Sequence, residues 1–275
     1  MERLPFYKMS GSGNDFVIID NRKKVLEDAR LTDFIQNVCR RKMSVGADGV
    51  ILIEPAEKKD FQWRFFNSDG SRAEMCGNGA RCAARFAFLN GIAGPDMVFG
   101  TDAGDIQATV KAEKVRIRMT DPFDYNPLIK LTVDGREMEM SSINTGVPHT
   151  VIRIDDLSAV NVVDIGRKVR QHGVFAPAGT NVNFISPQSG KQVAIRTYER
   201  GVEGETLACG TGAVAGALVY AMHSGADSPV DMVTQSGSCL TVYFQKKGNT
   251  CGDVFLEGDA RVIYTASLTP DAWKY

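Results

Sequence analysis

Two stretches of the chain, Met75-Cys76-Gly77-Asn78-Gly79-Ala80 and Ala208-Cys209-Gly210-Thr211-Gly212-Ala213, carry one local pattern. Their cysteines stand at positions 76 and 209, so the pattern recurs after 133 residues. Each stretch follows an apolar run and a turn-rich loop, Phe66-Asn67-Ser68-Asp69-Gly70 in the first case and Tyr198-Glu199-Arg200-Gly201 in the second. Each also opens a run of small residues that is typical of a closely packed helix. The repetition predicts two strand-loop-helix units, each with a thiol where its helix starts.

The residues around these helices predict a chain dominated by short strands. Apolar and β-branched runs predict strands at 16–20, 49–54, 61–67, 106–110, 115–119, 192–199, 239–244, 254–257 and 261–265. Helical patterns cover 32–41, 77–89, 162–171 and 210–224. The stretch 120–127 is rich in turn and helix-breaking residues and is predicted to be a linker.

The fold class expected from this pattern is α+β, with an internal duplication. On each side of the predicted linker lies a comparable set of strands, one auxiliary helix and one Cys-led helix. We therefore expect two pseudo-symmetric domains, each a β-rich half-barrel wrapped around a central Cys-led helix. The N-terminal half is expected to cover 1–119, completed by a C-terminal strand at 262–275, and the C-terminal half to cover 120–261.

Composition indicates a globular enzyme with a small-molecule partner. With 275 residues, 43% of them hydrophobic and 24% charged, the chain has enough material for one large or two medium domains. With a formal charge of −1 and a pI near 6.3, the chain lacks the net positive charge typical of proteins that bind nucleic acid or an anionic membrane. The first residues show no apolar signal core, and no apolar run approaches the roughly 20 residues that span a bilayer. We expect a cytoplasmic protein.

The six cysteines do not follow the spacing of a zinc ribbon or a redox pair. Cys76 and Cys82 are six positions apart, and the others are isolated. We therefore expect no metal and a reducing compartment. Cys39 and Cys82 lie in apolar helical contexts, which predicts buried thiols without a chemical role.

The start of a helix suits both a reactive thiol and an anion. Unpaired backbone N–H groups and the positive end of the helix dipole lower a thiol's pKa and attract a carboxylate. Glycines beside Asn78 and Thr211 would let a carboxylate approach these N–H groups closely. The same glycines could instead serve only close helix packing, but finding the pattern twice argues for the functional interpretation.

A matched pair of thiols suits the inversion of a stereocentre by proton transfer. Such a reaction needs a base on one face of the carbon and an acid on the other, and the two exchange roles in the reverse direction. The Cα–H of an amino acid is a weak acid, so the carbanion needs stabilisation. Two helix starts directed at its carboxylate would provide electrostatic stabilisation of this kind.

Five stretches, in order along nearly the whole chain, resemble the diaminopimelate epimerase family. They are Gly11-Ser12-Gly13-Asn14-Asp15-Phe16, Phe66-Asn67-Ser68-Asp69-Gly70-Ser71, Cys76-Gly77-Asn78-Gly79-Ala80-Arg81-Cys82, Gly179-Thr180-Asn181-Val182-Asn183-Phe184 and the segment from Glu199-Arg200 to Cys209-Gly210-Thr211-Gly212. The resemblance implies an epimerase that needs no pyridoxal phosphate or other cofactor. It implies interconversion of LL- and meso-diaminopimelate for lysine and peptidoglycan precursor synthesis, by a homodimer.

The resemblance also implies residue roles. Cys76 and Cys209 would be the acid/base pair. The helix-start residues Gly77, Asn78, Gly210 and Thr211 would hold the reacting carboxylate. The distal amino-acid end would be bound by Asn14, Asn67, Asn181 and Arg200, with Glu199 near the reacting amine. His149, in Thr145-Gly146-Val147-Pro148-His149, matches the family's Gly-Asn-Pro-His segment and would support a catalytic group.

Some of these residues also have a purely structural interpretation. Asn14 and Asn67 lie in turn-rich sequence, where Asn commonly binds its own backbone, and His149 could be a satisfied structural residue. Arg200, directly after a strand, suits bidentate carboxylate binding. Two positions depart from the family pattern, because Val147 replaces an Asn and Gly49 stands where some members carry Gln. Both changes remove a side chain that could contact the substrate.

Three other functions remain open. Proline or hydroxyproline racemases have a similar layout, but their first thiol is typically followed by Gly-His, whereas Gly77-Asn78 follows Cys76 here. A racemase of histidine or of broad specificity could use an altered pocket, as Val147 and Gly49 would suggest. In a different class, the two cysteines could form a redox-sensing disulfide in a binding protein.

Overall fold

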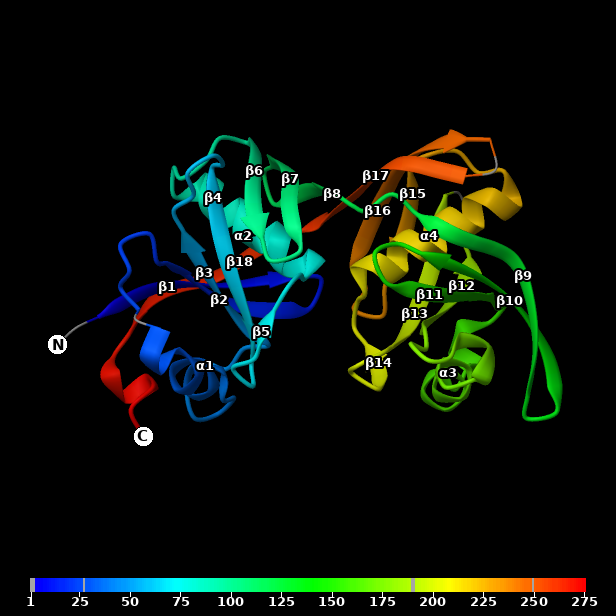
Figure 1. Ribbon diagram of the computed structural model, residues 1–275, viewed down its shortest axis with the longest axis horizontal. Coiled ribbons are helices and arrows are strands. Elements are labelled where there is room, and N and C mark those ends of the chain that lie inside the picture. Colours follow the sequence, from blue (N-terminus) through cyan, green and yellow to red (C-terminus); the bar gives the residue numbers. More distant parts are fainter. Residues whose placement is uncertain (1–2, 27, 189–190, 249) are drawn as a thin grey trace. The chain divides into compact units, whose positions relative to one another are not determined.

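The computed structural model describes residues 3–26, 28–188, 191–248 and 250–275 and divides into two compact units. Unit 1 comprises Met1–Ile117 and Gly258–Tyr275, and unit 2 comprises Arg118–Glu257 (Figure 1). The α+β class predicted from the sequence is confirmed, with eighteen strands and four α-helices among the described residues. No helix in the described ranges has the length and apolar composition needed to cross a membrane.

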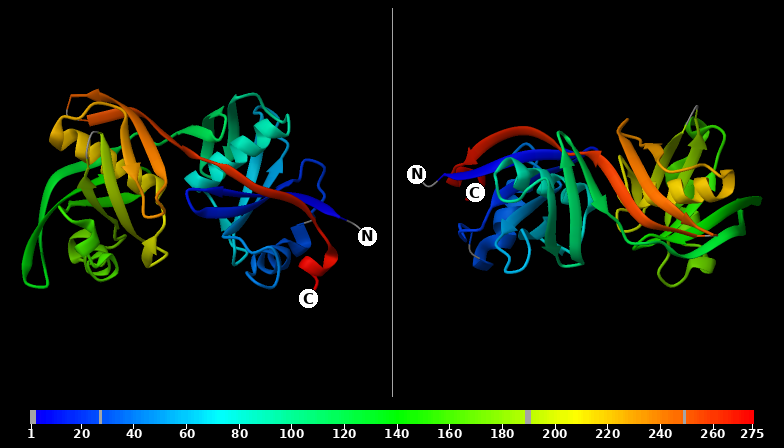
Figure 2. Two further views of the ribbon diagram at one scale, coloured as in Figure 1. Left: turned by 180° about the vertical axis from the view of Figure 1, so that it is seen from behind. Right: turned by 90° about the horizontal axis from the view of Figure 1, so that it is seen from above.

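Unit 1 consists of β-strands, two α-helices and two short 3₁₀ helices. Its elements are β1 (Leu4–Gly11), β2 (Asn14–Asp20), the 3₁₀ helix η1 (Asp28–Arg30), α1 (Leu31–Cys39), β3 (Gly49–Glu54), β4 (Phe61–Asn67), β5 (Arg72–Ala73), α2 (Gly77–Leu89), β6 (Asp96–Thr101), β7 (Gly104–Lys111), β8 (Lys114–Arg118), β18 (Arg261–Leu268) and η4 (Pro270–Ala272). β2 is parallel to β3, β4 is antiparallel to β3, and β6 is parallel to β4. β18 pairs with β1, and Figure 2 shows these two strands side by side from behind.

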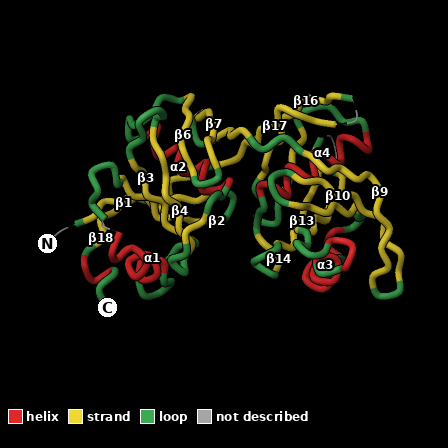
Figure 3. Tube along the Cα trace, in the orientation of Figure 1, coloured by secondary structure: helices red, strands yellow, loops and turns green. Residues whose placement is uncertain are grey.

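Unit 2 has a similar order of elements. They are β9 (Phe123–Val133), β10 (Arg136–Asn144), β11 (Pro148–Arg153), η2 (Leu157–Ala159), α3 (Val162–Arg170), η3 (Gly173–Phe175), β12 (Asn181–Pro187), β13 (Gln192–Glu199), β14 (Gly204–Thr206), α4 (Gly210–Ser224), β15 (Val230–Val233), β16 (Cys239–Lys247) and β17 (Thr250–Asp259). The strand paired with its β10 comes first, as β9, whereas in unit 1 the strand paired with β1 comes last, as β18. β11 is parallel to β12, β13 is antiparallel to β12, and β15 is parallel to β13. The strands β11, β12, β13 and β15 therefore correspond in their pairing to β2, β3, β4 and β6, in agreement with the predicted duplication. Figure 3 shows the strands of each unit in yellow and its helices in red.

The predicted linker at 120–127 is only partly correct. Its residues from Phe123 onward belong to β9, which pairs antiparallel with β10 through an irregular register. Pro127 lies between the paired residues Asn126 and Ile129, where the register shifts, and a proline without an N–H is tolerated at such an irregularity. The sequence pattern also did not predict strands β1, β5, β6, β9, β10, β11, β12, β14 and β15.

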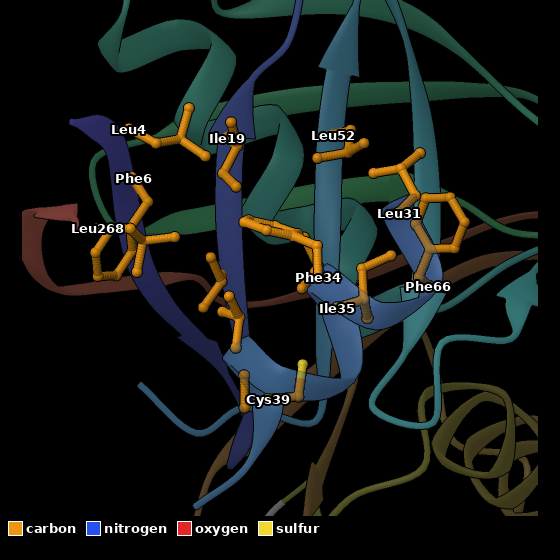
Figure 4. Packing of buried hydrophobic residues seen from close by; sticks show 14 residues of the cluster. Leu4, Phe6, Ile19, Leu31, Phe34, Ile35, Cys39, Leu52, Phe66 and Leu268 are labelled. Carbon is orange, nitrogen blue, oxygen red and sulfur yellow. The ribbon is translucent and has the colours of Figure 1, made fainter. Parts of the chain in front are cut away.

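The apolar runs in β2 and β3 do not alternate with polar residues because both faces of these strands are covered. Val17, Ile19, Val50 and Leu52 belong to a core cluster with Phe34 and other residues of α1 (Figure 4). The opposite face meets α2, where a Cβ added at Gly79 would lie 3.2 Å from Ile51 Cδ1 and 3.5 Å from Phe16 Cζ. Small residues in α2 thus allow it to lie directly on the strands.

The same arrangement holds in unit 2. Val162 and Val169 of α3 pack with Val182, Phe184 and Tyr198 on one face of the sheet. Helix α4 is buried along nearly its whole length and contacts strands β10 to β13, β15 and β16. It ends at Gly225, whose left-handed backbone (φ 77°) caps the helix. In each unit, the strands that pack against the Cys-led helix therefore fix the position of its first turn.

Candidate functional site

Cys76 is the residue that caps the start of α2. Its backbone is extended (φ −149°, ψ 114°) and its carbonyl accepts the first helical bond, from Ala80 N at 2.8 Å. Among the described residues, no side chain caps this helix start. The N–H groups of its first turn are therefore suited to bind an anion. Cys76 as a whole residue is half-buried.

Asn14 connects Cys76 to the strand ends of unit 1. Its Oδ1 accepts from Cys76 Sγ at 3.7 Å and from Asn78 Nδ2 at 3.5 Å. Its Nδ2 donates to Asp48 Oδ2 at 2.5 Å. The Asp48 carboxylate also accepts from the Asp15 backbone N–H, and it pairs with Arg41 at 3.0 Å. The orientation of the Asn14 amide is thereby set, with its oxygen toward the thiol.

Arg81 lies one turn into α2 and is completely buried. Its Nη2 donates to Asn78 Oδ1 at 2.8 Å and to Ser12 Oγ at 3.0 Å, and its Nη1 donates to the Gly77 carbonyl at 3.4 Å. Ser12 in turn donates its hydroxyl to Asp259 Oδ1 at 3.0 Å. Burial lowers the pKa of Arg81, and nearby negative charge, including that of a Cys76 thiolate, opposes this effect. The guanidinium thus holds the helix start and the β1–β2 turn together.

Asn67 ends β4 and is mainly engaged in its own turn. Its backbone N–H binds the Ser71 carbonyl at 2.9 Å, and its Nδ2 donates to Ser71 Oγ at 3.1 Å. The registers Phe16↔Gly49 and Gly49↔Asn67 place it at the same end of the sheet as Asn14. This local hydrogen bonding agrees with the structural interpretation of Asn67, whose side chain is exposed.

Cys209 caps α4 in the same way, but its sulfur is more enclosed. The side chain is buried, with Sγ 3.4 Å from the Gly212 N–H and 3.5 Å from Thr211 Oγ1. The Thr211 carbonyl accepts from Thr145 Oγ1 at 3.1 Å, which connects the helix start to the loop between β10 and β11. The thiol therefore accepts a bond from the helix's own first turn.

Asn181, Glu199 and Arg200 meet at the adjoining ends of β12 and β13. Asn181 Oδ1 accepts from the Arg200 backbone N–H at 2.8 Å, and its Nδ2 donates to the Pro148 carbonyl at 3.1 Å. The Arg200 guanidinium donates to the Ala178 carbonyl at 3.1 Å but pairs with no carboxylate of the described residues. Burial raises the pKa of Glu199.

His149 is fully enclosed at the start of β11. Its Nδ1 lies 3.1 Å from Asn183 Nδ2, and its Nε2 has no hydrogen-bond partner among the described residues. Burial, with a smaller contribution from the charge of Arg200, lowers the pKa of His149 to about 3. The imidazole is therefore neutral at ordinary pH.

The structure places the predicted residues of each unit at the start of its Cys-led helix and at the ends of the strands or the loops that follow them. In unit 1 these are Asn14, Asn67, Cys76, Gly77 and Asn78, and in unit 2 they are His149, Asn181, Glu199, Arg200, Cys209, Gly210 and Thr211. Sequence reasoning assigned no role to Asp48, Arg81, Thr145 or Asn183. Arg81 and Asn183 both lie within stretches that carry the family resemblance. Arg81 could have been noticed because it is a charged residue inside a run of small residues.

Gly49 departs from the family pattern for a visible packing reason. A Cβ at this position would overlap the Phe66 carbonyl oxygen and lie 2.7 Å from Cε2 of the Phe65 ring. A glutamine therefore does not fit this backbone unless β4 or the ring shifts. Val147 lies in the tight loop before His149, where its carbonyl accepts from the Thr145 N–H at 3.2 Å.

Comparison with known proteins identifies relatives over nearly the full length. The family model described as diaminopimelate epimerase matches residues 6–124 and 141–263. A diaminopimelate epimerase of Aquifex aeolicus is 46% identical, covering 99% of this chain and 100% of its own, and one of Archaeoglobus fulgidus is 41% identical, covering 86% and 88%.

Solved structures share the fold at low sequence identity. A Bacillus anthracis phenazine biosynthesis protein of the PhzF family superposes with a TM-score of 0.76 at 16% identity, covering 98% of this chain and 100% of its own. A hydroxyproline epimerase from Agrobacterium vitis superposes with a TM-score of 0.67 at 15% identity, covering 98% and 97%. At such identities these structures support the architecture alone.

Proposed function

The chain belongs to the diaminopimelate epimerase family, and on this premise we propose that it interconverts LL- and meso-2,6-diaminopimelate by a two-base proton transfer at Cα. It is an isomerase of the epimerase kind. The observation that carries the mechanistic proposal is the placement of Cys76 and Cys209, each at the start of the buried helix of its own unit. The product would serve lysine and peptidoglycan precursor synthesis in the cytoplasm.

In the proposed reaction, one thiolate removes the proton from Cα and becomes a thiol. The electron pair left on carbon delocalises into the carboxylate, and the other thiol donates its proton to the opposite face, becoming a thiolate. The proton count is unchanged, and the reverse reaction uses the same groups in exchanged roles. The chemistry requires only protein groups, so we propose that no cofactor or metal takes part.

The reacting carboxylate would bind to the backbone N–H groups at the two helix starts, from Gly77-Asn78 and Gly210-Thr211. These donors are fixed before the substrate arrives, because Asn78 is held by Arg81 and Thr211 by Thr145. Preorganised donors stabilise developing charge without reorganisation during the reaction. The backbone N–H dipoles at the helix starts would therefore stabilise the negative charge that delocalises from Cα into the carboxylate.

The distal end of diaminopimelate carries a second carboxylate and a second ammonium group. Arg200 suits that carboxylate, because its guanidinium pairs with no carboxylate of the described residues and can bind bidentately. Asn181 fixes the Arg200 backbone, and Asn14 and Asn67 would add amide contacts. Glu199 would accept from the reacting amine, and His149 would support the site with its ring N–H. We also propose that the protein acts as a homodimer.

The test is turnover of the purified, reduced protein with LL-diaminopimelate in deuterated water, without pyridoxal phosphate and with a chelator. Deuterium at Cα of both the LL and the meso forms is the expected result. Proline and histidine, offered separately under the same conditions, should show no exchange.

Exchange with proline or histidine alone would retain the two-thiol mechanism and contradict the substrate. Exchange with none of the three would contradict the proposed function and favour a binding protein with a redox-active cysteine pair. Reversible oxidation of Cys76 and Cys209, measured by mass spectrometry with ligand binding intact, would then be the property to examine.

A further inference from the structure

Asn183 lies on β12 with no exposed surface and uses both ends of its side-chain amide. Its Nδ2 is 3.0 Å from the Thr150 carbonyl and 3.1 Å from His149 Nδ1, and its Oδ1 accepts from Thr197 Oγ1 at 3.0 Å. A backbone carbonyl can only accept, so the end of the amide that faces Thr150 must be the NH₂ group. The orientation of the Asn183 amide is therefore determined by the backbone.

This orientation also decides the protonation of His149. The NH₂ group of Asn183 can only donate, so the Nδ1 atom facing it must be an acceptor without a proton. In a neutral imidazole the proton then lies on Nε2. Neutrality is consistent with the lowered pKa of His149, whose first cause is burial and whose second is the positive charge of Arg200.

The resulting Nε2–H is a buried donor without a partner among the described residues. Such a group costs free energy unless a ligand satisfies it. Asn183 also touches the first turn of α4, because a Cβ at Gly212 would overlap Asn183 Oδ1 and lie 3.2 Å from Cys209 Sγ. One amide thus lies between the imidazole and the helix start that carries Cys209.

We propose that Asn183 is a positioning residue that locks His149 as a neutral Nε2–H donor, and that this N–H binds a carboxylate oxygen of the substrate. The second half rests on the proposed function. An N–H donor needs an acceptor, and in diaminopimelate the ammonium groups only donate, so the acceptors are carboxylate oxygens. His149 is then a hydrogen-bond donor and does not transfer protons during turnover.

The tautomer can be measured without any assay of activity. The chain has three histidines, so a sample labelled with ¹⁵N-histidine gives a simple imidazole spectrum. We expect His149 to show an unprotonated Nδ1 and a protonated Nε2 that stay unchanged between pH 5 and pH 9. His172 and His223 serve as internal references. A protonated Nδ1, or titration of His149 in this range, would overturn the locked tautomer.

Ligand binding is tested on the same sample. Saturating diaminopimelate should shift the Nε2–H resonance, whereas 1,5-diaminopentane, which keeps both amines and lacks the carboxylates, should not. An unmoved resonance in a sample that turns over diaminopimelate would overturn the carboxylate contact and leave the proposed function intact. Absence of turnover would instead contradict the proposed function, with the tautomer still decided by the ligand-free spectrum.

Asn183→Asp tests the positioning role. A carboxylate beside Nδ1 can only accept, so it should draw a proton onto Nδ1 and lower kcat about tenfold or more. The matched control is Asn161→Asp, at the start of α3, where Asn161 Oδ1 accepts from the Asp164 N–H and an aspartate retains that bond. Unchanged Nδ1 protonation and kcat in Asn183→Asp would contradict the proposal. If this variant fails to fold, the spectrum of the parent protein still decides the tautomer.

Discussion

The guanidinium of Arg81 binds the side-chain oxygen of Asn78 across one turn of α2, with Nη2 2.8 Å from Oδ1. The same nitrogen reaches Ser12 Oγ, 69 positions away in the chain. A buried arginine thus connects the helix start at Cys76 to the turn before Asn14. Because Arg81 binds the side-chain oxygen of Asn78, the backbone N–H of Asn78 keeps a constant direction.

Arg81→Met should weaken both the fold and the reaction. The change leaves Asn78 Oδ1 and Ser12 Oγ without this donor, and we expect the free energy of unfolding to fall by about 1–3 kcal/mol. Turnover of diaminopimelate should fall with it, and Arg81→Lys should recover only part of the loss, because one ammonium cannot replace the planar fork.

Urea unfolding and steady-state kinetics measure these effects. The control is Arg85→Met, one turn further along α2, where Nη1 donates to the Ala260 carbonyl and does not touch the helix start. We expect its kcat to stay within about twofold of the parent, since Arg85 binds the Ala260 carbonyl and not Asn78 or Ser12. Parental kcat in Arg81→Met would refute the positioning role of this residue.

Cys76→Ala and Cys209→Ala should each stop epimerisation in both directions, because one proton donor or acceptor is then missing. The expected loss in kcat is roughly 10²- to 10⁴-fold. Chiral chromatography of reactions started from LL- and from meso-diaminopimelate measures it. Cys39→Ala, at the last residue of α1 and in the hydrophobic core, serves as the control and should retain activity. Normal turnover in either of the first two variants would rule out the two-thiol mechanism.

Arg200→Met should mainly affect substrate binding. Loss of a charge-assisted contact to the distal carboxylate predicts a KM increase of about tenfold to a hundredfold, with a smaller change in kcat. Arg153→Met, at the exposed end of β11, is a control from the same unit. An unchanged KM for diaminopimelate in Arg200→Met would place the distal carboxylate elsewhere.

Gly49→Gln should destabilise unit 1, although it restores a residue found in some family members. Its Cβ would overlap the Phe66 carbonyl oxygen and press on the Phe65 ring, and such overpacking costs about 1–3 kcal/mol. Thermal unfolding measures the change. Gly94→Gln is the matched control, because a Cβ there meets only the Asp96 carbonyl at 3.9 Å. Equal melting temperatures for the two variants would show that β4 and the ring adapt freely.

Alkaline pH should destabilise the fold through two buried thiols. Burial raises the pKa of Cys39 and of Cys82 from 9.0 to about 12. Between these values the unfolded chain releases protons that the folded chain keeps, so the free energy of unfolding falls as pH rises. The contribution is fully present below pH 9 and is lost as the pH approaches 12. Urea unfolding at several pH values from 8 to 11 should show a shallower fall in Cys82→Ala than in the parent. Parallel curves would contradict this assignment.

Local sequence patterns were sufficient to predict the parts of the fold whose causes are local. The α2 and α4 ranges were predicted at 77–89 and 210–224 and are confirmed, because each helix starts at a Cys-Gly pair and continues in small residues. The fully buried runs in β2 and β3 were also evident. In contrast, β9 was mistaken for a linker, since its partner β10 makes it a strand despite Pro127.

The sequence by itself determined the fold class and the placement of the two cysteines at helix starts. Only the tertiary structure decided how the residues around them are held. Arg81 reaches Ser12, and Asn183 reaches the backbone of Thr150 and the ring of His149, through bonds between distant parts of the chain. Such bonds depend on strand register and on which way each buried amide must face, and periodicity and composition do not encode either one. The physical reason is that a buried polar group must find a partner in space, wherever that partner lies in the sequence.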